Sequence, residues 1–344
     1  MLASNTTNST LYRQTLNRMG WSMLLFIGLF NATTTVSTAV DAVRTFITSP
    51  LWAKVFTVIY GVLSPICYMF PFFMAGWFFY ILSRRTRADR VLFEVKLPHE
   101  FPLLILAGIA ILTAGAYVNS WFCSAIGYTI PEEMSVAGVY DDPSMVILYM
   151  SVALAPAFAE EFLFRGVFYT NLRPYGRTQA ILISSLLFAL MHQNIGQLFY
   201  TFVAGIAMAL MYELTGSIWC SVFFHLLNNE LSIISEVIYY GWGGATAEAC
   251  LTVFDAILFL LGIISLILLI VYYKKQAACR NMGRVSGIFG VREETALRGD
   301  RPLSASSVVK GALCPGMIVF TAVTVALMGM TWLMLEILNS GVLM

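Results

Sequence analysis

The chain has 344 residues, of which 59% are hydrophobic and 11% are charged, and its formal net charge is +1. A soluble globular domain carries about 25% charged residues. The composition therefore excludes a soluble globular protein and indicates that the lipid bilayer is the solvent for most of the chain. The six cysteines are scattered without a CxxC pair, so we expect neither a disulfide nor a zinc framework.

Segment 1–20 is polar up to its first arginine and has no cleavage-like end, so we expect no signal peptide. Beyond it, several apolar runs approach or exceed the length of about 20 residues that a helix needs to cross the hydrocarbon layer. They lie at about 21–43, 51–83, 101–123, 144–172, 178–194, 196–214, 217–240, 250–273 and 312–337. None alternates with period two as barrel strands do. The fold class predicted is all-α, a polytopic membrane bundle of about eight or nine transmembrane helices.

Two local patterns refine these spans. Run 51–83 contains Pro65 and Pro71, which predict a kink or a break. Runs 178–194 and 196–214 are short and nearly contiguous, which predicts a tight helical hairpin around HQNIGQ with Gly196 at the turn.

The charged loops predict an orientation. The connections 84–100, 166–178 and 274–311 are basic. By contrast, segment 131–143 has acidic residues but no Lys or Arg, and 241–249 has no Lys or Arg either. By the positive-inside rule the basic loops and the N-terminus are cytoplasmic. We expect a multi-pass plasma-membrane protein with N-terminal helices (1–143), a catalytic core (144–240) and C-terminal helices (241–344), the last with a basic cytoplasmic loop at 274–311.

Ionisable and amide side chains inside the spans are rare, and such residues in membranes usually pair or serve function. A rise of about 1.5 Å per residue places three of them, Glu160, His192 and Asn229, at a similar depth, roughly 18 to 21 Å from the cytoplasmic ends of their helices. The full set is Glu160, Glu161, Arg165, His192, His225, Asn228, Asn229 and Glu230. We therefore expect three helices to bring acid, imidazole and amide groups together.

The spacing within each helix indicates which side chains face one another. Glu161 and Arg165 are four residues apart with the acid first, which favours an ion pair. Glu160 points about 100° away from Glu161, so one carboxylate neutralises the arginine while the other is free to react. His225 and Asn229, also four apart, share a face. Taken singly, His192 is equally explained as a core histidine bonded to a backbone carbonyl, and His225 and Asn229 as hydrogen-bonding groups between helices.

Three motifs occur in order: EExxxR at 160–165, FxxxH at 188–192 and HxxxN at 225–229. Together they resemble the CPBP family, which comprises CAAX prenyl proteases of the Ras-converting type and bacteriocin-processing or immunity proteins. The resemblance covers about 145–240. It implies an all-α intramembrane endopeptidase with a cavity opening to the cytoplasm.

The resemblance also implies roles for the residues. Glu160 and His192 would hold and activate the water, and His225 and Asn229 would bind the oxyanion of the tetrahedral intermediate. The supporting residues would be Glu161 and Arg165.

Two mechanisms remain open from the residues. Burial raises the pKa of a carboxyl group toward neutrality, where it can act as a base, and hydrogen-bond donors stabilise a developing oxyanion. We favour this glutamic mechanism, without a cofactor. The alternative is a zinc site at Glu160, His192 and His225 with one open position. There is no HExxH motif, and asparagine is a poor zinc ligand.

The function predicted is hydrolysis of a peptide bond in a membrane-bound or lipidated, CAAX-like polypeptide. The partners expected are the lipid bilayer and a polypeptide substrate, either prenylated or a peptide precursor, and no nucleic acid. The alternative is a bacteriocin self-immunity protein on the same scaffold that does not strictly depend on proteolysis. A proton-coupled transporter is disfavoured, because the polar cluster does not lie on paired broken helices in two halves of the chain.

Overall fold

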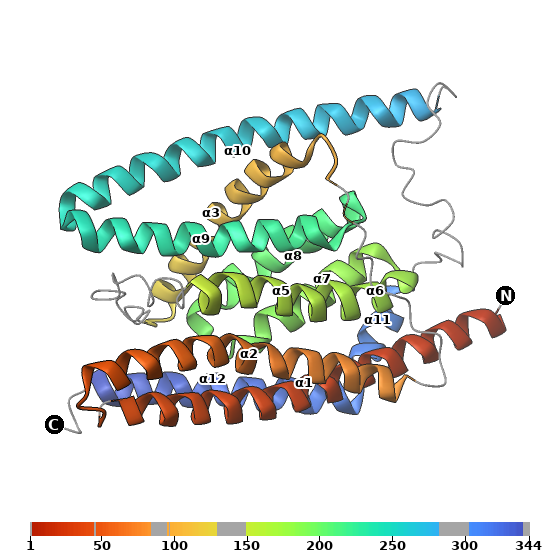
Figure 1. The fold of residues 1–344 in the computed structure, drawn as a ribbon. Coiled ribbons are helices and arrows are strands. Elements are labelled where there is room, and N and C mark those ends of the chain that lie inside the picture. Colours follow the sequence, from red (N-terminus) through yellow and green to blue (C-terminus); the bar gives the residue numbers. More distant parts are fainter. Residues whose placement is uncertain are drawn as a thin grey trace.

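The structure is a computed structural model that describes residues 2–44, 46–83, 95, 97–128, 149–281 and 303–339. Over these residues the chain is helical and contains no strand (Figure 1). The predicted fold class, an all-α polytopic membrane bundle, is confirmed. The predictions for residues 84–94, 129–148 and 282–302, including most of the basic loop 84–100 and the acidic segment 131–143, lie outside the described residues.

The long helices follow the predicted runs closely. In chain order the elements are α1 (Leu2–Arg44), α2 (Pro50–Leu82), α3 (Phe101–Ala125), η1 (Tyr149–Leu154), α5 (Ala155–Glu161), η2 (Phe162–Tyr169), α6 (Thr170–Leu172), η3 (Arg173–Tyr175), α7 (Arg177–Met191), η4 (Ile195–Gln197), α8 (Leu198–Thr215), α9 (Ile218–Trp242), α10 (Gly244–Asn281), α11 (Ala305–Ala312) and α12 (Pro315–Asn339). The segments η1 and η2 are π-helical.

Six helices in the described part of the chain are long and apolar enough to cross a membrane. They are Asn8–Val43, Pro50–Leu82, Phe101–Ala125, Ile195–Thr215, Gly244–Lys275 and Pro315–Ile337. The other three predicted spans are helical as well. One is built from the short segments η1 to α6, one is the shorter apolar helix α7, and one is α9, which carries acidic residues.

Four local expectations can be compared with the helices of the structure. Helix α2 continues through Pro65 and Pro71, so the predicted break is absent. The hairpin of α7 and α8 forms as predicted, and Gly196 is buried in its turn. A larger residue would not fit there, because an added Cβ would lie 2.7 Å from the Tyr128 ring. Helix α1 starts about twenty residues before the predicted span. Helices α10 and α11 extend into both ends of the predicted loop 274–311.

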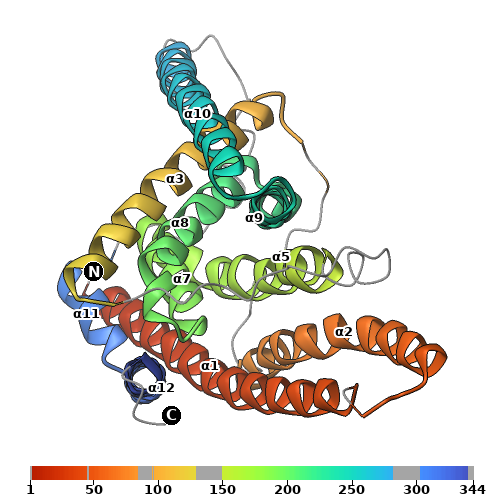
Figure 2. The ribbon, with the colours of Figure 1, turned by 90° about the vertical axis from the view of Figure 1, so that its left-hand side faces the viewer.

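The helices form three layers, which the end-on view shows (Figure 2). Helices α1, α2 and α12 form one layer, α5, α7 and α8 lie in the middle, and α3, α9 and α10 cover the other side. The described ends of the three basic loops lie at one end of the bundle, at the right of Figure 1. This arrangement agrees with the predicted alternation of the spans.

Glycines allow the first and last of these helices to meet at the backbone. A Cβ added to Gly20 of α1 would lie 2.2 Å from the Gly316 carbonyl carbon of α12. The Asn17 side chain accepts a hydrogen bond from the Gly316 amide at 2.8 Å. Small residues that bring backbones together are a usual basis of helix packing in membranes. The layer of α1, α2 and α12 is therefore fixed at this crossing.

Candidate active site

The two glutamates end a short α-helical stretch between π-helical segments. Glu160 and Glu161 are the last residues of α5, and Arg165 lies in η2. All three side chains are buried. π-Helical turns widen the backbone spiral and are frequent at functional sites.

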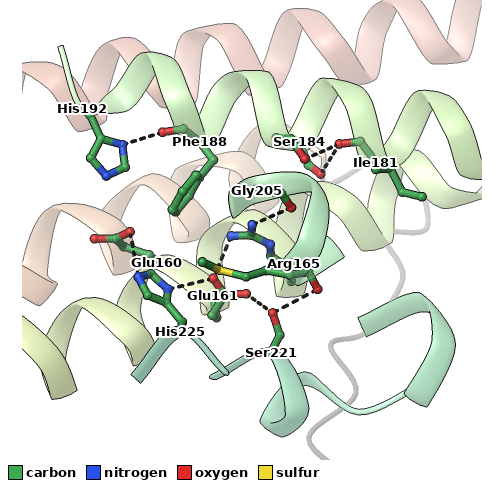
Figure 3. Close-up of polar contacts among 12 residues, drawn as sticks. Glu160, Glu161, Arg165, Ile181, Ser184, Phe188, His192, Gly205, Ser221 and His225 are labelled. Atoms are coloured by element: carbon green, nitrogen blue, oxygen red, sulfur yellow. Dashed lines mark hydrogen bonds and ion pairs between the residues drawn. The ribbon is translucent and has the colours of Figure 1, made fainter. Parts of the chain in front are cut away.

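Glu161 is the centre of the buried charge network (Figure 3). Its Oε1 accepts from Arg165 Nη1 at 2.7 Å and lies 3.0 Å from His225 Nδ1, while its Oε2 accepts from the Ser221 hydroxyl. The carboxylate and the guanidinium are both 0% exposed. The predicted ion pair between Glu161 and Arg165 is confirmed, and Glu161 in addition holds the His225 ring.

Arg165 has further partners that the sequence did not indicate. Its Nη2 donates to the Gly205 carbonyl of α8 at 2.9 Å. Its Cζ lies 4.6 Å from the centroid of the Phe188 ring, so the guanidinium also makes a cation–π contact. Phe188 is buried and touches both imidazoles, with ring centroids 5.0 Å from His192 and 5.9 Å from His225. Phe188 therefore packs inside the bundle between the guanidinium and the two imidazoles.

Glu160 is in a different environment from its neighbour. Its Oε1 accepts a hydrogen bond from the Tyr68 hydroxyl of α2 at 2.5 Å. Its Oε2 is buried without a hydrogen-bond partner among the described residues, and lies 3.8 Å from His225 Nε2. That distance is too long for a direct hydrogen bond but allows one water to contact both atoms. Within the described part of the chain no arginine pairs with the Glu160 carboxylate, in contrast to Glu161.

Each of the two imidazoles is held through its own Nδ1 atom. His192 follows the end of α7, and its Nδ1 lies 2.9 Å from the Phe188 carbonyl oxygen. Because a carbonyl and a carboxylate only accept, Nδ1 of His192 and Nδ1 of His225 are both donors. The opposite edge of the His192 ring is turned toward Glu160 (Figure 3). In the neutral form of each ring, Nε2 is therefore a free acceptor.

The asparagine of the HxxxN motif lies at the edge of this cluster. Asn229 Nδ2 donates to the Val152 carbonyl of η1 at 3.1 Å, and Asn229 Oδ1 accepts from Asn228 Nδ2 at 3.3 Å. Asn228 Oδ1 in turn accepts from the Tyr200 hydroxyl at 2.8 Å. Glu230 lies outside the charge network and accepts from the Tyr149 hydroxyl at 2.9 Å. The Asn229 amide is thus close to the site but engaged with the backbone of η1.

Sequence reasoning missed two residues that contact the glutamates. Ser221 is four residues before His225 on α9, so the helical spacing would have placed it on the same face. Tyr68 carries no such signal, because it lies 92 residues before Glu160 in the chain.

The residues suggested for zinc do not form a ligand cluster here. Within the described residues, no group of three His, Cys, Asp or Glu side chains is arranged to hold a metal ion. Five cysteines in this part of the chain are free thiols. One oxygen of Glu160 already accepts from Tyr68. The proposed mechanism therefore routes no step through a metal.

The site lies within the bundle, away from the described ends of the basic loops, which gather at the right of Figure 1. His192 is the first residue of the 192–197 turn between α7 and α8. Glu160 is twelve residues before the end of α6, or about 18 Å at the helical rise.

One comparison with known proteins finds a match, over the segment that holds the three motifs. No curated protein and no solved structure matches the chain. Residues 142–231, which hold all three motifs, match the family model described as type II CAAX prenyl endopeptidase Rce1-like. This match confirms the predicted resemblance over the segment that contains the motif residues, and it indicates a CAAX-type intramembrane endopeptidase, a membrane hydrolase.

Proposed function

We propose that this protein hydrolyses a peptide bond of a membrane-bound or lipidated polypeptide, using Glu160 as the base. The observation that carries the proposal is the unequal environment of the two Glu160 oxygens. One is fixed by Tyr68, and the other is buried, unbonded and 3.8 Å from an imidazole nitrogen.

In the first step a water bound at Glu160 Oε2 attacks the scissile carbonyl carbon. Glu160 takes one proton from the water as the new C–O bond forms and the carbonyl becomes an oxyanion. The Nε2 of neutral His192 accepts a hydrogen bond and orients the water. This assignment is supported by the His192 Nδ1 contact to Phe188 O, which leaves Nε2 free to accept.

His225 and Asn229 are the proposed oxyanion donors. With Nδ1 donating to Glu161, His225 can donate from Nε2 only as the imidazolium, whose charge Glu161 stabilises at 3.0 Å. Asn229 would exchange its bond to the Val152 carbonyl for the oxyanion. In the second step the oxyanion re-forms the carbonyl, the C–N bond breaks and Glu160 returns its proton to the leaving nitrogen, so that a carboxylic acid and an amine are released.

We propose a prenylated CAAX-like peptide or a peptide precursor as substrate, in the plasma membrane, with the N-terminus cytoplasmic. We also keep the division into 1–143, 144–240 and 241–344 as a proposal. The core of this division is close to the matched segment 142–231.

The test is cleavage of prenylated CAAX peptides by purified protein in proteoliposomes, with and without a chelator. Glu160→Gln keeps the shape of the side chain and removes the basic oxygen, so cleavage should fall to the background. The matched control is Glu336→Gln, the same substitution on α12, where the side chain accepts from Trp332 and is exposed.

Cleavage by Glu160→Gln at the wild-type rate would refute the base assignment. Loss of activity in chelator, restored by zinc, would refute the metal-free step. A Glu160→Gln protein that cannot cleave but still protects cells from a bacteriocin would transfer the function to the immunity alternative.

A further inference from the structure

The hydrogen bond from α2 to the catalytic carboxylate is the strongest feature that the motifs do not explain. Tyr68 lies outside the matched segment 142–231, and its hydroxyl donates to Glu160 Oε1 at 2.5 Å. We propose that Tyr68 is a positioning residue for Glu160, which holds the carboxylate so that Oε2 receives the water. This inference rests on the proposed function.

The hydrogen bond from Tyr68 restrains the terminal torsion of the Glu160 side chain. The terminal torsion of a glutamate is broad, so an unrestrained carboxylate samples many orientations. A rotated Glu160 would bring one oxygen into direct contact with His225 Nε2, which is 3.8 Å away, and would move the other oxygen out of the position proposed for the water. By holding Oε1, Tyr68 fixes the plane of the carboxylate and keeps Oε2 unbonded.

The tyrosine ring is itself held in place. It packs at 5.3 Å from Phe72 on its own helix and at 5.7 Å from Phe30 of α1, measured between ring centroids. The hydroxyl is therefore presented to Glu160 by a side chain with little freedom to move. A donor fixed in advance costs little entropy when the reaction requires it.

Helix α2 stays against the site without this hydrogen bond. The Phe73 ring packs at 5.0 Å from Phe162 and at 6.3 Å from Phe158, both beside the glutamates in the chain. Gly76 lets Phe162 approach, since an added Cβ would lie 3.1 Å from that ring. Removing the Tyr68 hydroxyl should therefore leave the helix packing intact.

The experiment is steady-state cleavage by Tyr68→Phe, with Tyr60→Phe as the matched control. Tyr60 is on the same helix, and its hydroxyl bonds to Ser37 at 2.7 Å, away from Glu160. We expect Tyr68→Phe to lower kcat about 10- to 100-fold while KM stays within about twofold, because Tyr68 contacts the base and not the substrate. Tyr60→Phe should change neither value.

A second pair of variants separates positioning from folding. At position 68, 4-aminophenylalanine keeps a donor, whereas 4-methylphenylalanine has the same size without one. We expect the first to recover kcat and the second to remain slow, with equal melting temperatures. Unchanged kcat in Tyr68→Phe, a rise in KM alone, or equal rates for this pair would each overturn the inference. An inactive wild-type protein would instead refute the proposed function.

Discussion

Replacing Glu161 with glutamine removes one charge from a fully buried pair. Arg165 would keep its contacts to the Gly205 carbonyl and the Phe188 ring but lose its countercharge. The Glu161 carboxylate now accepts hydrogen bonds from Arg165, Ser221 and His225. Glutamine would place an N–H group, which cannot accept, against one or two of these donors. Breaking one side of a buried ion pair costs about 3–5 kcal/mol. We therefore expect a melting temperature lower by about 5–10 °C.

The assay is thermal unfolding of the purified protein in detergent, followed by size-exclusion chromatography. Glu160→Gln is the matched control, because it makes the same substitution at the adjacent residue and leaves the ion pair of Arg165 intact. The amide oxygen of the introduced glutamine can still accept from Tyr68. We expect that control to lose less than about 1.5 kcal/mol. The double variant Glu161→Gln with Arg165→Met should recover much of the loss, because no unpaired charge remains. Equal melting temperatures for Glu161→Gln and Glu160→Gln would refute the reasoning.

Three further predictions concern other parts of the molecule. Asn229→Ala should lower turnover of a CAAX peptide about a hundred- to a thousandfold and leave measurable activity; an unchanged rate would remove it from the oxyanion site. Gly20→Ala should lower the melting temperature, because its Cβ would lie 2.2 Å from the Gly316 backbone, whereas Gly28→Ala on the same helix meets nothing within 4 Å and should not. In a chain whose native cysteines are replaced by alanine, Ala305→Cys should react with an impermeant thiol reagent only from the cytoplasm and Thr48→Cys only from outside; reversed labelling would invert the orientation.

The helices were predictable because hydrocarbon imposes length and apolarity on every span. The predicted run 196–214 differs by one or two residues from α8 (Leu198–Thr215). The early start of α1 was not predictable from apolarity, since its first turns are polar. Tyr12, Leu16 and Met19 nevertheless bury one face of them in the core. Of the predicted kink or break at Pro65 and Pro71, the break does not occur, because neighbouring helices in a membrane can accommodate a missing backbone donor.

The site was predictable where local spacing determines it. The i, i+4 relation gave the Glu161–Arg165 pair correctly, even though Arg165 lies in a π-helical segment. The π-helical turns themselves depend on packing between helices and leave no local pattern. The bond from Tyr68 depends on the contact between α2 and α5, which a single sequence does not reveal.

The crossing of α1 and α12 has a consequence for biogenesis. About 300 residues separate Gly20 from Gly316, and a ribosome adds on the order of 5–20 residues per second, so α1 waits roughly 15 to 60 seconds for its partner. Throughout that interval Gly20 lacks the α12 backbone that it contacts in the folded chain. Helix α2, which presents Tyr68 to the glutamate, packs against α1. Proteolytic competence should thus mature only after the α12 segment has left the ribosome, so that a half-made chain in the membrane is not yet a protease.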